Sequence, residues 1–224
     1  MKGVFQVPRE FVVIGLGMFG RVVALGLARE NQAVLAIDIN QDEVNRFASD
    51  LDAVVQADAT DEDALRELRL ERMSCAVVAI GAESMEASIL TTALLRQIGV
   101  PRIVARSLSD LHARVLRAVG AHEVVSPEVE MGQRLAHRLT HPNILDRFDL
   151  GDNAQLAEVE VPVQFVGKSL VEIDVRRRHD LTVVAIHRGD DVIANPGRDE
   201  ELRTGDVLVV IASPGAVARF AARV

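Results

Sequence analysis

Phe11-Val-Val-Ile-Gly15-Leu-Gly17-Met18-Phe19-Gly20 joins a short apolar run to glycines at the spacing GxGxxG. In this pattern Gly15 makes the tight turn after a strand, Gly17 lets the backbone approach a phosphate, and Gly20 lets a helix pack closely on the strand. The free amide groups and the positive dipole end at the start of that helix favour an anion. The stretch therefore predicts a strand, a turn and a helix that bind a nucleotide phosphate.

A carboxylate ends the next apolar run, Ala33-Val-Leu-Ala-Ile-Asp38. Asp38 follows the glycines by about 20 residues, at the tip of the second expected strand, where it can accept hydrogen bonds from both ribose hydroxyls. Its charge would repel a 2′-phosphate, so NADP is disfavoured. NAD, ATP, ADP and AMP all remain candidates.

Strand patterns alternate with amphipathic helix patterns as far as residue 127. The expected strands are 11–15, 33–38, 53–57, 75–81, 102–106 and 123–126. Capping boxes are expected for Asn40 with Glu43 and for Thr60 with Asp63, and helix ends are expected at Gly99 and Gly120. Apolar strands linked by helices indicate a parallel sheet covered on both faces. The predicted fold class is α/β, with a doubly wound Rossmann domain over residues 1–127.

The pattern changes after Pro127. A helix is expected from Glu128 to His141, followed by a second short helical segment over 144–148. These segments carry bulky apolar side chains with no sheet of their own to cover: Leu135, Leu139, Ile144, Leu145 and Phe148. We therefore expect residues 128–150 to form a helical crossover that packs on a second copy of the chain.

Beyond Gly151 the periodicity becomes strand-like. Strands are expected at 156–161, 182–186, 192–194 and 207–212, with a helix starting at Pro214. Residues 151–224 are thus predicted to form a small α+β domain.

The composition excludes several classes of protein. The 224 residues carry a formal net charge of −8, which argues against a nucleic-acid partner. The longest apolar runs have the length of strands, so no direct membrane insertion is expected. Cys75 is the only cysteine, which fits a reducing cytoplasm without disulfides.

The residue types also argue against catalysis. The chain contains no Tyr or Trp, and its only lysines are Lys2 and Lys168. This removes a tyrosine–lysine dehydrogenase site and, in the Rossmann half, a P-loop or Schiff-base lysine. His137 and His141 have the i, i+4 spacing of helical metal ligands but lack a third ligand. We expect no catalytic residues and a nucleotide that acts as a signal. Two alternatives stay open. One is an NAD-dependent oxidoreductase with a site formed by oligomerisation, and the other is a regulatory module of a cation antiporter.

Several motifs together carry a family resemblance. Besides the glycine stretch they are Asp38-Ile-Asn40, Asp58-Ala-Thr60, Ala79-Ile-Gly81-Ala82, Val104-Ala-Arg106, Ser126-Pro-Glu128, Gly167-Lys-Ser-Leu170, Ile186-His-Arg-Gly189 and Leu202-Arg-Thr-Gly-Asp206. The chain resembles the regulator-of-potassium-conductance (RCK) proteins of bacterial potassium uptake, the KtrA and TrkA family, in the single-copy KtrA-like form. This implies a cytoplasmic octameric ring of dimers, docked at the inner face of the cell membrane on a potassium-translocating subunit of the KtrB or TrkH kind. Nucleotide binding would reshape the ring and gate the channel.

The resemblance also implies roles for individual residues. Phosphate contacts would come from Gly15, Gly17, Met18, Phe19 and Gly20 on one side and from Gly81, Ala82 and Arg106 on the other. Asp38 with Asn40 would face the ribose, and Asp58, Ala59 and Thr60 would face the adenine. Relatives often have arginine where this chain has Met18, so a direct arginine contact to a terminal phosphate is lost.

Further ligands follow from the same resemblance. Glu128 would help to hold a divalent cation, Mg or Ca, between neighbouring nucleotides. ATP or ADP is the expected ligand, with NAD(H) as an alternative. Related C-terminal domains bind cyclic di-AMP, and a hairpin here could offer apolar faces and a cation to it through Ile186, Arg188, Asn195 and Pro196. A plain dimerisation hairpin is the alternative.

Overall fold

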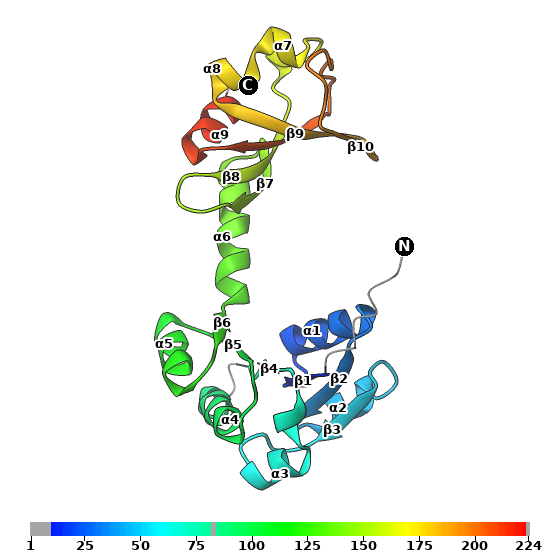
Figure 1. Cartoon of the computed structure of the whole chain (residues 1–224), viewed down its shortest axis with the longest axis vertical. Coiled ribbons are helices and arrows are strands. Elements are labelled where there is room, and N and C mark those ends of the chain that lie inside the picture. Colours follow the sequence, from blue (N-terminus) through cyan, green and yellow to red (C-terminus); the bar gives the residue numbers. More distant parts are fainter. Residues whose placement is uncertain (1–9, 82–83, 223–224) are drawn as a thin grey trace. The chain divides into compact units, whose positions relative to one another are not determined.

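The computed structural model describes residues 10–81 and 84–222. The chain divides into two compact units, Met1–Glu128 and Val129–Val224. Figure 1 shows the elements of each unit in their order along the chain.

The first unit contains a parallel sheet in the order β3-β2-β1-β4-β5-β6. Its strands are β1 (Glu10–Ile14), β2 (Ala33–Asp38), β3 (Ala53–Gln56), β4 (Cys75–Val78), β5 (Ile103–Arg106) and β6 (Glu123–Val125). Ile14 is in register with Ile37 of β2 and with Val78 of β4. The carboxyl ends of these three strands therefore meet at one edge, where the strand order reverses and where such sheets bind ligands. The predicted doubly wound sheet is confirmed.

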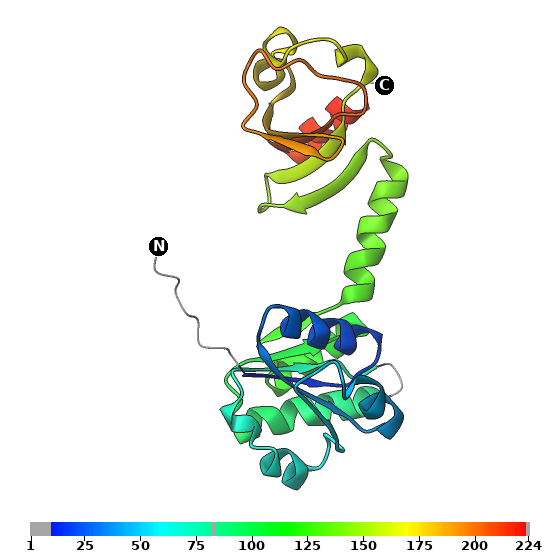
Figure 2. The same ribbon diagram turned by 90° about the vertical axis from the view of Figure 1, so that its right-hand side faces the viewer.

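Helices lie on both faces of this sheet (Figure 2). They are α1 (Met18–Arg29), α2 (Gln41–Phe47), α3 (Glu62–Glu67), α4 (Met85–Ile98) and α5 (Asp110–Val119), with a 3₁₀ turn at Leu70–Arg72. Val12 packs into the core that contains Leu95 of α4, whereas its neighbour Val13 packs into the core that contains Ala24 of α1. Successive strand residues thus point to opposite faces, and each face buries its own apolar core.

Both predicted capping boxes are wrong, although α2 begins where expected and α3 begins one residue later than expected. Asn40 caps α2 by accepting from the N–H of Asp42 at 2.9 Å, while Glu43 pairs with Arg46 at 2.9 Å instead of reaching back. The cap of α3 is Asp61, not Thr60. An Asx-type bond to the residue two positions on competes with the capping box in both places. The expected helix ends at Gly99 and Gly120 are confirmed, with φ of 98° and 119°.

In the second unit, an antiparallel sheet has the order β10-β9-β11-β8-β7. Its strands are β7 (Ile144–Asp149), β8 (Gln155–Glu160), β9 (Leu181–Arg188), β10 (Asp191–Ala194) and β11 (Val207–Ala212). The helices are α6 (Pro127–Thr140), which begins at the end of the first unit, then α7 (Leu170–Ile173), α8 (Val175–His179) and α9 (Pro214–Ala221), with a 3₁₀ turn at Val163–Phe165. The predicted α+β domain is confirmed.

The expected helix over 144–148 is wrong, because this segment is strand β7. It pairs antiparallel with β8, and Phe148 lies opposite Leu156. Ile144 is 2% exposed in the core of the second unit, and Leu145 is partly buried, so neither needs a second copy to cover it. Isoleucine and phenylalanine at the two ends of this segment suit a half-buried strand, and pairing with β8 decides the conformation of so short a segment.

Of the helices in the described ranges, none has the length and apolar character required to cross a membrane.

Candidate nucleotide-binding site

A cavity of about 650 Å³ opens at the carboxyl ends of β1, β2 and β4. This volume lies in the range of cofactor pockets. The predicted site residues that line it are Gly15, Gly17, Asp38, Asn40, Asp58, Ala59, Thr60 and Gly81. Apolar side chains, Ile37, Ile39, Ile80 and Ala87 among them, line the space between the polar groups. The structure thus brings most of the residues predicted from the sequence into one cleft.

The glycine turn has the geometry that its sequence predicts. Gly15 has φ of 95°, a conformation that side chains disfavour. A Cβ atom on Gly20 would lie 1.8 Å from the carbonyl oxygen of Gly15, so Gly20 permits the close packing of α1 on the turn. A Cβ atom on Gly17, by contrast, would meet nothing within 4 Å. Gly17 therefore faces open space at the start of α1, where a ligand can approach the backbone.

Asp38 joins the end of β2 to the glycine turn. One carboxylate oxygen accepts from the N–H of Leu16 at 2.5 Å, and the other accepts from the N–H of Asn40 at 2.8 Å. An ionised carboxylate has about four acceptor positions, so two remain for further donors. The carboxylate is thus held in one orientation at the cavity wall, with capacity for ribose hydroxyls.

Asp58 and Thr60, which follow strand β3, also line the cavity. One oxygen of Asp58 accepts from both the backbone N–H and the hydroxyl of Thr60, at 2.8 and 2.7 Å. These bonds, the hydroxyl bond foremost, lower the pKa of the Asp58 carboxyl below its ordinary value. The carbonyl oxygen of Ala59 accepts from the buried hydroxyl of Thr91 at 3.0 Å, which fixes this loop to α4.

The helix α4 contributes residues that the sequence analysis missed. Ser84, Ala87 and Thr91 line the cavity, and the Ser84 hydroxyl caps α4 by accepting from the N–H of Ala87 at 3.3 Å. Their spacing of i, i+3 and i+7 places them on one helical face. A serine before an apolar helix, with a threonine two turns later, was the available signal. Ala82, also predicted here, lies outside the described residues.

Three carboxylates line the cavity, those of Asp38, Glu43 and Asp58. Among the described residues of the lining there is neither lysine nor arginine. This distribution suits groups that donate hydrogen bonds, such as ribose hydroxyls and the adenine amino group. A phosphate must then depend on backbone amides and on cations beyond the lining.

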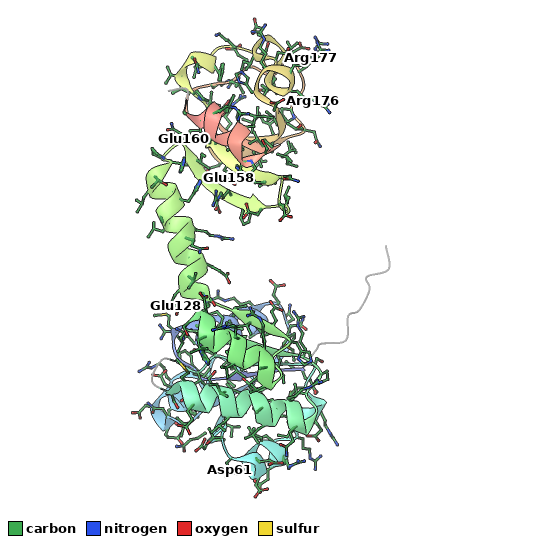
Figure 3. The ribbon with its side chains drawn as sticks, turned by 90° about the vertical axis from the view of Figure 1, so that its left-hand side faces the viewer. Asp61, Glu128, Glu158, Glu160, Arg176 and Arg177 are labelled. Carbon is green, nitrogen blue, oxygen red and sulfur yellow. The ribbon has the colours of Figure 1, made fainter. Side chains whose placement is uncertain are left out.

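Arg106 and Glu128 do not line the cavity but form an ion pair with each other. The Arg106 side chain is 16% exposed, and its guanidinium carbon lies 5.9 Å from the centre of the Phe19 ring. Glu128 lies at the start of α6 and is largely exposed (Figure 3). The structure therefore pairs the predicted phosphate contact with the predicted cation ligand.

The three predicted residues at the start of α1 also lie apart from the cavity. Met18, Phe19 and Gly20 begin α1 just beyond its edge. Within the ranges that the structure describes, no three His, Cys, Asp or Glu residues are grouped as a metal site requires. A cation at Glu128 would need ligands from a nucleotide or from a second chain, so its metal role stays a prediction.

The four residues predicted to bind a second ligand on the C-terminal hairpin do not share one surface in this chain. Ile186 is fully buried in the core of the second unit, so it cannot stack on a base. Arg188 donates to Asp206 at 3.0 and 2.8 Å and to Glu200 at 2.9 Å, so its charge is already neutralised. Pro196 lines a separate hollow of about 450 Å³, which Asn195 does not line. Arg188 was predicted as a phosphate contact from the family resemblance, and its carboxylate partners, which are distant in sequence, were not foreseen.

The fold and the cleft together define a Rossmann domain followed by a small α+β domain. Residues 11–127 match the TrkA-N domain and residues 156–224 match the TrkA-C domain. The chain is 38% identical over 216 residues to Ktr system potassium uptake protein C of Bacillus subtilis (strain 168), covering 96% of this chain and 97% of that protein. The chain therefore belongs to the KtrA/TrkA family, with one copy of each domain, as its motifs predicted.

Solved structures share this fold. The GsuK channel bound to NAD superimposes with a TM-score of 0.66 at 19% identity, over 98% of this chain and 40% of that one. GsuK bound to ADP superimposes with a TM-score of 0.54 at 20% identity, over 62% of this chain and 36% of that one.

Proposed function

We propose that this chain is the nucleotide-sensing regulatory subunit of a potassium uptake system and is not an enzyme. The observation that carries the proposal is the cleft at the ends of β1 and β2, in which Asp38 is fixed against the glycine turn by its bond from Leu16. The full-length likeness to a Ktr potassium uptake protein supports the physiological role.

The expected ligand is ATP or ADP, with NAD(H) as the alternative. Asp38 and Asn40 bind the ribose, the Asp58–Thr60 loop lies beside the adenine, and the amides of the glycine turn bind the phosphates. The NAD and ADP complexes of GsuK support an adenine nucleotide in a domain of this fold.

The gating role requires an assembly and a membrane partner. The side chains of Met131, Leu135 and Leu139 are exposed on α6, and that helix has no buried residue in the described chain. A second copy would cover them in a dimer, and dimers would build an octameric ring at the cytoplasmic face of the membrane. The ring would dock on a potassium-translocating subunit and change shape when the nucleotide changes.

An enzymatic role lacks suitable groups in the cleft. The described lining contains no His, Lys, Cys or Tyr, so its only side chains for proton transfer at neutral pH are carboxylates. A nucleotide held there has no evident chemistry to perform. This favours a nucleotide that regulates the protein by changing its conformation.

Flux measurements test the proposal. The chain is reconstituted with its co-purified membrane subunit in potassium-loaded vesicles, and ion flux is recorded with ATP, with ADP and without nucleotide. We expect the flux to differ between ATP and ADP, and Asp38→Ala to remove the difference. Nucleotide binding without any effect on flux would overturn the gating role. Turnover of NADH with a substrate would support the oxidoreductase instead.

A further inference from the structure

The first turn of α1 carries a cationic side chain, Arg21, for which the sequence predicted no role. The guanidinium of Arg21 donates through Nη2 to the sulfur of Met18 at 2.8 Å. Arg21 also closes the first helical turn, because its N–H donates to the carbonyl oxygen of Gly17 at 3.0 Å. Helical side chains lean toward the N-terminus, so the guanidinium lies back at the start of the helix. It therefore lies against Met18, the residue that follows Gly17 at the edge of the cavity.

Arg21 differs from the other cations near the cleft. Arg106 is paired with Glu128, and Arg46 is paired with Glu43. In the described chain, no carboxylate lies within ion-pair distance of Arg21. Its acceptor is a thioether, which is a weak one. Phosphate oxygens would bind the guanidinium far more strongly, because both partners would be charged.

The start of α1 is also prepared for an anion. Gly17 has no side chain to cap the first amide groups, and the first turn contains no acidic residue. These amides therefore have no side-chain acceptor of their own. The cavity extends from Asp38, the proposed ribose contact, to Gly17, so a chain of phosphates laid along the glycine turn would leave the cavity beside Met18. The last phosphate of that chain would come close to the sulfur of Met18, to which Arg21 donates a hydrogen bond.

We propose that Arg21 recognises the terminal phosphate of the bound nucleotide. This inference rests on the proposed nucleotide site. It explains how that site would distinguish ATP from nucleotides with fewer phosphates. It assigns to Arg21 the phosphate contact that the sequence predicted for Arg106. Met18 then serves as the rest position of the guanidinium when no terminal phosphate is present.

Calorimetric titration of the full chain with ATP, ADP and AMP, in chelator, tests the inference. The variants are Arg21→Gln, which removes the charge, and Arg21→Lys, which keeps the charge but not the planar fork. The matched control is Arg29→Gln, an exposed arginine at the other end of the same helix. Arg106→Gln tests the competing assignment.

We expect Arg21→Gln to weaken ATP binding by about tenfold or more, as the loss of a charged hydrogen bond predicts, and to change AMP binding by less than about twofold. Arg21→Lys should retain part of the ATP affinity, and Arg29→Gln should retain all of it. An unchanged ratio of ATP to AMP affinity in both Arg21 variants would overturn the inference while the nucleotide site stands. A wild-type chain that binds no adenine nucleotide would overturn both.

Discussion

The carboxylate of Asp38 accepts a hydrogen bond from the backbone N–H of Leu16 at 2.5 Å, across 22 positions of sequence. The same group that would bind the ribose therefore also orders the turn that would bind the phosphates. Replacing Asp38 should therefore affect both the ribose contact and the order of the glycine turn.

Asp38→Ala is expected to remove most of the rise in melting temperature that adenine nucleotides produce. Each charged hydrogen bond to a ribose hydroxyl contributes roughly 1.5 to 3 kcal/mol. The fold should persist, since the residues beside Asp38 keep their strand pairing. Thermal unfolding with and without ATP measures the effect, with the exposed Asp42→Ala as the control. Equal shifts in Asp38→Ala and wild type would contradict the assignment.

Two glycines of the turn should respond differently to alanine. Gly20→Ala is expected to destabilise the first unit by about 3 kcal/mol or more, because its methyl group would overlap the carbonyl oxygen of Gly15. Gly17→Ala should leave the unfolding free energy within about 1 kcal/mol, since no atom lies within 4 Å of the new methyl group. It should nevertheless weaken nucleotide binding by obstructing the backbone. Denaturant unfolding and ATP titration separate the two effects, and a Gly17→Ala chain with normal ATP affinity would argue against a phosphate at this turn.

Much of this cleft was predictable because its signals are local. The glycine spacing predicted the turn, and the short distance from the turn to Asp38 predicted the second strand end. The pairings of Arg106 with Glu128 and of Arg188 with Asp206 were not predictable, since they depend on which strands and loops become neighbours. Strand β7 was missed for the same reason, because pairing with β8 decides the conformation of a segment too short to show its own period.

The ion pair between the partly buried Arg188 and the buried Asp206 should make the second unit sensitive to acid. Asp206 is 1% exposed, and the hydrogen bonds from Arg188 hold the pKa of its carboxyl below the ordinary value. A lowered carboxyl pKa stabilises the fold above the unfolded-state value near 4, and this stability is lost as the pH falls through the lower folded-state value. Asp206→Asn should cost about 3 kcal/mol at pH 7 and flatten the acid dependence. Denaturant unfolding between pH 7 and pH 3 decides the point; equal acid dependence in Asp206→Asn would show that other groups cause it.

The exposed side chains of α6 should hold copies of the chain together. Light scattering at micromolar concentration is expected to give a mass well above the 24.4 kDa of one chain. The double change Leu135→Asp and Leu139→Asp should lower that mass, because it places charges in the apolar contact. Gln133→Asp, an exposed position on the same helix, is the control. A wild-type mass of one chain would rule the interface out.

The pairing of Glu128 with Arg106 bears on the expected role of a divalent cation. The cation would have to draw Glu128 away from Arg106, and the adenosine contacts at Asp38 and Asp58 would not be involved. We therefore expect Mg or Ca to increase the preference for ATP over ADP by a further tenfold or less, which corresponds to roughly 1.4 kcal/mol, beyond the preference that Arg21 gives in chelator.

Glu128→Gln should then reduce the effect of the cation without abolishing nucleotide binding, because it removes the carboxylate charge and leaves the cleft intact. It should also free Arg106, so ATP affinity in chelator should stay the same or rise. Titrations of ATP and ADP with Mg, with Ca and with chelator make the measurement, and Glu130→Gln, an exposed position on the same helix, is the control. A cation effect of the same size in Glu128→Gln and wild type would show that the cation is held elsewhere. Arg106 and Glu128 would then be a structural ion pair at the start of α6.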